Sequence, residues 1–221
     1  PPFFGDFHMS SIFTLTASDL ASLLCSKVCH DIISPVGAIN NGLELLEEGG
    51  ADDAAMDLIK TSARNASARL QFARIAFGAA GSAGVQIDTG DAQAVATEYM
   101  RGEKAEFTWT GGRAYLPKNK VKLLLNLILV ANGSIPRGGT LDVVLEDLEG
   151  SPVFRLSVAG RMLRAQPKFD ELQTADKYGA PPDEPVDAHS VQAYYTLLLA
   201  SEAGMTIDID EGEEKIVFTA S

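Results

Sequence analysis

Hydrophobic residues recur at helical spacing near the start of the chain. Between residues 20 and 46 the apolar positions lie three, four or seven residues apart, as they do along one face of an α-helix. Ser18 or Asp19 can cap the start of this helix, and the pair Gly49-Gly50 ends it. The apolar face comprises Leu20, Leu24, Val28, Ile32, Ile39, Leu43 and Leu46.

A second amphipathic segment follows after a short break. It starts at Asp52 or Asp53, and its apolar positions alternate in steps of three and four, which makes an a/d seam. Two long helices joined by so short a break predict an antiparallel hairpin. Because two helices alone cannot bury so long a seam, we expect a second copy to complete a four-helix bundle, and hence a homodimer. The seam comprises Met56, Ile59, Ala63, Ala66, Leu70, Ala73 and Phe77.

The pattern changes after the second helix. Residues 78–84, rich in glycine, alanine and serine, are typical of a linker. Helical and strand-like segments then alternate, except in the poorly patterned stretch that holds Pro167 and Pro185. We expect helices at 91–102, 117–133 and 186–203, and strands at 105–110, 140–146, 153–158, 205–210 and 214–219.

These elements predict an α+β protein in three parts. Residues 1–15 form a tail, and residues 16–78 form the N-terminal helical hairpin of the dimeric four-helix bundle. Residues 85–221 gather strands beside helices, which predicts a C-terminal two-layer α/β sandwich.

Composition and charge narrow the functional classes. A net charge of −12 argues against a partner such as nucleic acid or an anionic membrane, because both require a positive surface. No apolar run approaches the about 20 residues of a membrane span, and the first residues do not resemble a secretory signal. Cys25 and Cys29 lie one helical turn apart, which is poor geometry for a disulfide, so we expect a reducing cytoplasm. These cysteines and the adjacent His30 cannot converge on a tetrahedral metal from one helix.

His30 is the candidate reactive residue. It lies two positions from Val28 and from Ile32, about 200° around the helix from each, so its ring should point to solvent. Such an imidazole offers a free ring nitrogen that can accept a phosphoryl group. Asp31 can either orient the ring or take its proton, and Pro35 can bend the helix just beyond. On these residues alone, an ordinary surface histidine is a comparable reading.

The hairpin also predicts which residues surround His30. Counting back from the turn places Arg69, Phe72 and Arg74 of the second helix near it, and either arginine could balance phosphate charge. Partner contacts are expected from these three and from the first-helix residues Ser34, Ala38 and Asn41.

The chain resembles the core of a sensor histidine kinase over residues 20–219. The run from His30 to Pro35 resembles the family's H-box, and the hairpin resembles its dimerisation and phosphoacceptor domain. Residues 125–139 resemble the N-box and its trailing Pro-x-Gly-Gly turn. The resemblance implies that the second domain derives from an ATP-binding domain.

Several nucleotide-binding residues of that family are missing, so the ATP-binding domain is degenerate. Val130 stands where the family has its magnesium-binding asparagine, and a valine offers no oxygen to a hard cation. Gly160 stands at the adenine-binding aspartate, Met162 and Arg164 replace the glycines that follow, and residues 187–190 replace a glycine-rich loop. We therefore expect no cofactor in this chain, with magnesium supplied by the partner receiver domain.

An intact H-box beside a degenerate ATP site resembles the ChpT-type histidine phosphotransferases of alphaproteobacterial phosphorelays. That resemblance implies a dimer whose His30 takes a phosphoryl group from the receiver domain of a CckA-like hybrid kinase. The group then passes to CtrA-like and CpdR-like response regulators. The degenerate domain is expected to add a second contact through Arg161 and Arg164. The alternatives are an ATP-dependent kinase core and a catalytically silent dimeric adaptor.

Overall fold

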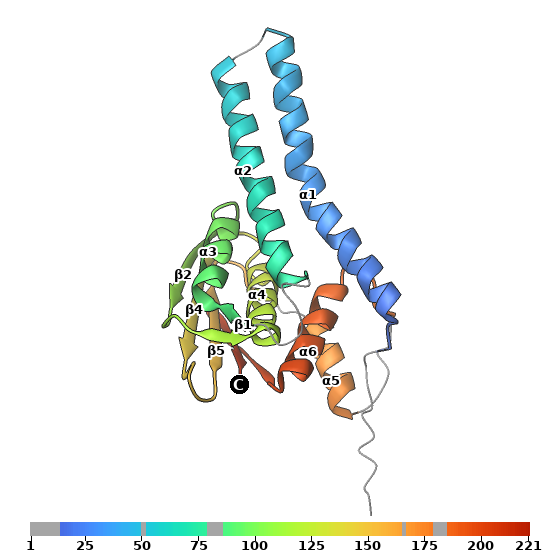
Figure 1. Ribbon diagram of the computed structural model, residues 1–221, viewed down its shortest axis with the longest axis vertical. Coiled ribbons are helices and arrows are strands. Elements are labelled where there is room, and N and C mark those ends of the chain that lie inside the picture. The colour runs from blue at the N-terminus through green and yellow to red at the C-terminus, as the bar shows by residue number, and fades with distance from the viewer. Residues whose placement is uncertain (1–13, 50–51, 79–85, 165–166, 179–184) are drawn as a thin grey trace, which may run out of the picture.

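Two long antiparallel helices form a stem that rises from an α/β lobe (Figure 1). The computed structural model describes residues 14–49, 52–78, 86–164, 167–178 and 185–221. Most of the predicted tail and nearly all of the predicted linker therefore lie outside the described residues. Among the described residues, no helix combines the length and the apolarity that crossing a membrane requires.

The stem consists of α1 (Ala17–Glu47) and α2 (Asp52–Ala76). The predicted hairpin is confirmed, but α1 begins earlier than expected. Its cap is Thr16 rather than Ser18 or Asp19, because the Thr16 hydroxyl accepts from the backbone N–H of Asp19 at 3.1 Å. The helix continues through Pro35, and its N-terminal part diverges from α2 toward α6 (Figure 1).

Small residues bring the two stem helices close together near the tip. Gly42 of α1 is buried, and an added Cβ there would lie 2.6 Å from the Ile59 side chain and 3.2 Å from the Ala55 carbonyl oxygen. Ala55 and Ala66 of α2 are also buried. Residues without bulk at these positions therefore set the close approach of α1 and α2.

The lobe contains the remaining helices and strands. Its elements in chain order are β1 (Gln86–Asp88), α3 (Thr89–Met100), β2 (Ala105–Thr110), β3 (Tyr115–Pro117), α4 (Lys118–Gly133), β4 (Gly139–Glu146), β5 (Val153–Ala159), α5 (Pro167–Tyr178), α6 (Val191–Ala203), β6 (Ile207–Glu211) and β7 (Lys215–Ala220).

Five strands form the main sheet in the order β2-β4-β5-β7-β6. Only β2 and β4 pair in parallel, and β1 with β3 makes a separate antiparallel pair. Alternate residues of β4 are fully buried, among them Leu141 and Val143, because α4 and α6 cover one face of the sheet (Figure 1). The predicted α+β class and two-layer sandwich are confirmed.

The lobe differs from the sequence prediction at two helices. Residues 167–178 form α5, which buries Phe169 and Leu172 in the core although the stretch showed no clear pattern. The last helix begins at Val191 rather than at residue 186 or 187. A turn at residues 188–190 precedes the helix instead. The Asp187 Oδ1 accepts from the backbone N–H of Ser190 at 2.8 Å and so stabilises this turn.

A buried amide joins the stem to the lobe. Asn126 of α4 donates to the carbonyl oxygen of Ala76, the last residue of α2, at 3.1 Å, and to that of Lys122 at 2.8 Å. The oxygen of the same side-chain amide accepts from the side chain of Gln192 of α6 at 2.8 Å. Since Asn126 is fully buried, these bonds fix the end of α2 against two lobe helices.

We predict that Asn126→Ala lowers the free energy of unfolding by about 2 to 4 kcal/mol, because it leaves a cavity and unpaired buried polar groups. Asn40→Ala, the same change at an exposed α1 position, should shift it by less than about 0.5 kcal/mol. Urea unfolding measures both values, and equal effects of the two changes would contradict this account of the junction.

Candidate functional site

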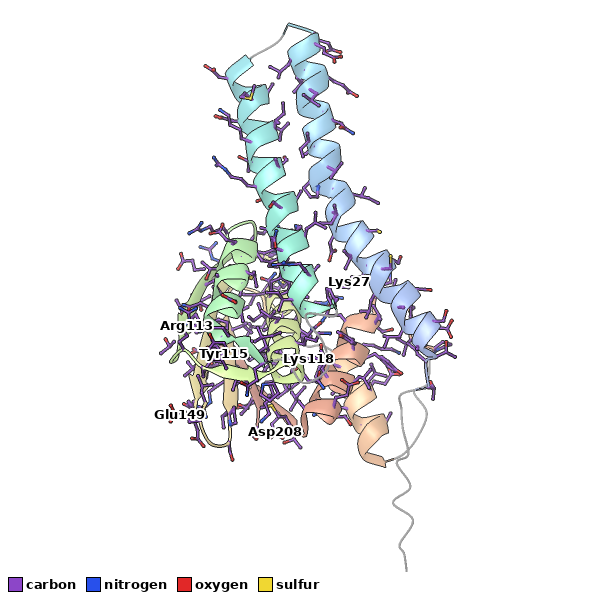
Figure 2. All side chains as sticks on the ribbon, viewed as in Figure 1. Lys27, Arg113, Tyr115, Lys118, Glu149 and Asp208 are labelled. Carbon is purple, nitrogen blue, oxygen red and sulfur yellow. The ribbon has the colours of Figure 1, made fainter. Side chains whose placement is uncertain are left out.

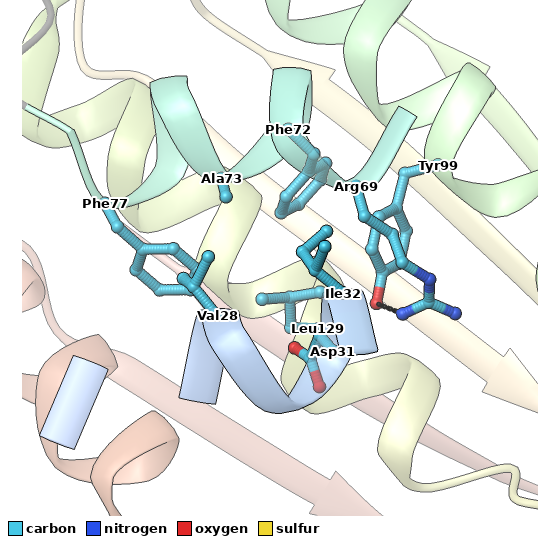
Figure 3. A pocket seen from close by; sticks show the side chains of 9 residues that line it. All are labelled: Val28, Asp31, Ile32, Arg69, Phe72, Ala73, Phe77, Tyr99 and Leu129. Carbon is cyan, nitrogen blue, oxygen red and sulfur yellow. Dashed lines mark hydrogen bonds between the residues drawn. The ribbon is translucent and has the colours of Figure 1, made fainter. Parts of the chain in front are cut away.

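The His30 side chain projects from α1 into solvent, with 91% of its surface exposed. Val28 and Ile32, on the other side of the helix, line a small cavity against α2 (Figure 3). The helical phase therefore placed the imidazole correctly. An exposed ring can be approached by another macromolecule without any rearrangement of this chain.

Asp31 lies beside the ring and also bonds a lysine. Its Oδ1 is 3.6 Å from Nδ1 of His30, and its Oδ2 accepts from Nζ of Lys27 at 3.3 Å. Lys27 projects from α1 near the end of α2 (Figure 2). The carboxylate thus offers one oxygen to each neighbour, and Nε2 of His30 is left on the open side of the ring. Sequence reasoning missed Lys27, although its i,i+4 spacing to Asp31 was a visible signal.

Beneath Asp31 is the small cavity where stem and lobe meet (Figure 3). Arg69 and Phe72 of α2 line this cavity together with Asp31, the neighbour of His30 in the sequence, whereas Arg74 does not line it. The complete lining is Val28, Asp31, Ile32, Arg69, Phe72, Ala73, Phe77, Tyr99 and Leu129.

Arg69 and Phe72 have partners inside the protein, which corrects their predicted roles. The Arg69 guanidinium donates to Glu103 at 2.7 Å and to the Tyr99 hydroxyl at 3.5 Å, so in this structure its charge is already paired within the protein. Phe72 is only 1% exposed and packs against Tyr99 with the ring centroids 4.6 Å apart. It has no surface with which to contact a partner, because the lobe covers the side of α2 that the hairpin leaves open.

Three of the other predicted contact residues on the stem are exposed. Ser34 and Asn41 lie on the same side of α1 as His30, one and three turns beyond it, and Ala38 between them is half-buried. Arg74 of α2 is exposed. Ser34 and Asn41 therefore form an accessible surface along α1 beyond His30.

Arg161 and Arg164 lie in the turn that follows β5, and both are exposed. The backbone N–H of Arg164 donates to the carbonyl oxygen of Ser134 at 2.8 Å, which pins this turn to the end of α4. The two arginines therefore stand at a defined place on the lobe surface.

Val130 and Gly160, two of the positions that depart from the kinase pattern, are closely packed. Val130 is 5% exposed and belongs to the core. A Cβ added at Gly160 would lie 2.7 Å from the carbonyl oxygen of Gly138, and one added at Gly139 would lie 2.0 Å from that of Ala159. Two backbone segments thus occupy the space that an aspartate at position 160 would need. Within the described ranges, no group of three or more His, Cys, Asp or Glu side chains is arranged to hold a metal ion.

We predict that Gly160→Ala destabilises the protein by about 1 to 3 kcal/mol, because rigid backbone atoms must move to admit the methyl group. Gly112→Ala is the matched control, since nothing lies within 4 Å of a Cβ added there, and it should change stability by less than about 0.5 kcal/mol. Thermal and urea unfolding compare the two, and an unaffected Gly160→Ala protein would show that the backbone is not closely packed.

Comparisons with known proteins identify the family of the chain. Residues 89–215 match the family model of the histidine phosphotransferase C-terminal domain. The chain therefore belongs to the histidine phosphotransferase family, a class of protein phosphotransferases.

Among its relatives is the protein phosphotransferase ChpT of Brucella abortus (strain 2308), which is 71% identical over 212 residues, 96% of this chain and all of the relative. A solved structure of a bacterial phosphotransferase superposes with a TM-score of 0.86 at 70% identity, covering 94% of this chain and 98% of that one. The histidine kinase AdeS of Acinetobacter baumannii is more distant, with a TM-score of 0.45 at 12% identity over 86% of this chain and 95% of that one.

Proposed function

We propose that this protein carries phosphoryl groups between receiver domains on His30. The observation that supports this most directly is the imidazole, which is 91% exposed and has Nδ1 facing Asp31. Membership of the histidine phosphotransferase family supports the same chemistry.

The transfer uses the open nitrogen of the ring. Nε2 attacks the phosphorus of a receiver's aspartyl phosphate in line, an N–P bond forms, and the P–O bond to the aspartate breaks with its electron pair. Asp31 faces the Nδ1–H and stabilises the positive charge that develops on the ring. The same steps in reverse load the next receiver. Because the transition state is loose, positioning and charge balance account for most of the catalysis.

The phosphoryl group comes from a receiver and not from ATP. Val130 provides no oxygen ligand for magnesium, and the backbone around Gly160 leaves no room for an adenine-binding aspartate. The magnesium that assists transfer is held by the receiver domain. This chain then needs no cofactor of its own.

A second copy of the chain completes the stem. Met56 and Leu70 of the predicted seam are 39% and 50% exposed in the single chain. On α1, Leu43 of the predicted apolar face is 47% exposed and Val36 is 43% exposed. A homodimeric four-helix bundle would bury this apolar surface along both stem helices.

The partners are a CckA-like hybrid kinase receiver as donor and CtrA-like and CpdR-like regulators as acceptors, in cell-cycle signalling. Ser34, Ala38 and Asn41 are proposed to contact each receiver beside His30, and Arg74 from α2. Arg161 and Arg164 add a contact from the lobe. The cytoplasm is the proposed compartment, in keeping with the free thiols of the chain.

Mixing the protein with a phosphorylated receiver domain tests the proposal. Acid-labile label should appear on the wild-type chain and be absent from His30→Ala, because the substitution removes the acceptor nitrogen. His189→Ala, at another exposed histidine, should label like the wild type. Label on His30→Ala, or none on the wild type with any cognate receiver, would reject the relay, and full pathway activity of His30→Ala would favour the silent adaptor.

The source of the phosphoryl group is tested separately. Incubation with γ-labelled ATP and magnesium should leave His30 unlabelled, and titration calorimetry should detect no nucleotide binding, since the pocket lacks its metal ligand and its aspartate. Autophosphorylation from ATP alone would show that the chain is a kinase instead.

A further inference from the structure

The lobe contributes a charged side chain to the junction beneath His30. Glu103 lies in the turn between α3 and β2, and its Oε1 accepts from Arg69 of α2 at 2.7 Å. We propose that Glu103 is a positioning residue for the His30 site, because it holds Arg69 away from Asp31 and so keeps Asp31 beside the imidazole. This inference rests on the proposed transfer through His30.

Arg69 binds one carboxylate and shares a cavity with another. It lines the same cavity as Asp31 (Figure 3), yet its ion pair is with Glu103. Tyr99 lines the same cavity, and its hydroxyl accepts from Arg69 at 3.5 Å. Burial raises the pKa of Tyr99 most, the negative charges of Glu103 and Asp31 raise it further, and Arg69 opposes them. Arg69 and Asp31 therefore share one cavity wall, while Glu103 is the carboxylate that Arg69 binds.

Removing Glu103 would change which carboxylate Arg69 binds. A guanidinium binds carboxylates through paired hydrogen bonds and is poorly stable without an acceptor in a partly buried site. Asp31 is the acidic residue that lines the cavity with Arg69. Turning toward Arg69 would take the Asp31 carboxylate away from Nδ1 of His30 and from Lys27, its present neighbours.

Glu103 is held in place by the lobe itself. Its Oε2 accepts from the side-chain amide of Asn132, at the end of α4, at 3.1 Å. The Arg69 and Glu103 side chains are only 25% and 20% exposed, so water screens their pairing less than that of a surface pair. Asn132, which belongs to the segment that resembles a nucleotide-binding motif, thus orients the residue that controls Arg69.

Transfer kinetics with phosphorylated receiver test this inference. Glu103→Gln keeps an oxygen that can accept from Asn132 but loses the negative charge that holds Arg69. We expect the rate constant for transfer to His30 within the complex to fall at least about fivefold, while receiver affinity stays unchanged. In the double variant Arg69→Gln/Glu103→Gln the competing cation is gone, and transfer should recover to several times the rate of Glu103→Gln. If Glu103 and Arg69 only stabilised the structure, the rate losses caused by Glu103→Gln and Arg69→Gln would add in the double variant.

Two further variants complete the design. Glu146→Gln removes the carboxylate of an exposed pair with Arg155 on the sheet and should transfer like the wild type. Asn132→Ala removes the hydrogen bond that holds Glu103 but keeps the charge of Glu103. It should also slow transfer to His30, as Glu103→Gln does. If Glu103→Gln does not fold, the rate of Asn132→Ala decides the inference.

Wild-type rates in Glu103→Gln, or a double variant no faster than Glu103→Gln, would overturn the inference. Neither result affects the labelling of wild type against His30→Ala, so a failure here is distinguishable from a failure of the proposed relay.

Discussion

The last turn of α2 docks into the core of the lobe, and this contact holds the stem in place relative to the lobe. Phe72 and Ala76 belong to the same hydrophobic core as the buried lobe residues, and the Asn126 amide ties the Ala76 carbonyl to α4 and, through Gln192, to α6. A helix end held by packing and by buried hydrogen bonds cannot swing independently of the lobe. The turn of α1 that carries Asp31 packs on this anchored part of α2, so the lobe fixes the surroundings of His30.

This arrangement gives the lobe a structural role at the stem that does not depend on binding nucleotide. A kinase lobe must bring ATP to the histidine, whereas an acceptor for incoming receiver domains needs an open imidazole and fixed neighbours. Here the backbone segments around Gly160 are closely packed, Val130 lies in the core, and Glu103 binds both Arg69 of the stem and Asn132 of α4. The lobe stabilises the stem and sets the charges beneath the imidazole.

The sequence predicted the stem and the outward face of His30 because a long amphipathic helix repeats its signal many times. It missed α5, where prolines flank a helix whose buried residues, such as Phe169, follow too short a pattern. Phe72 was misassigned because the periodicity of α2 does not reveal the lobe, which packs on this part of the helix and buries the ring. Glu103 could not be found from sequence, since only tertiary packing brings it to Arg69.

In the proposed relay one side chain, His30, carries the phosphoryl group. The most direct measurement is peptide mapping by mass spectrometry, under neutral conditions that preserve phosphohistidine, after the protein has been mixed with phosphorylated receiver. We expect a single phosphorylated peptide, and it should contain residue 30. Its modification should disappear when unphosphorylated acceptor receiver is added. A phosphoryl group on any other residue, or one that acceptor receiver cannot remove, would contradict it.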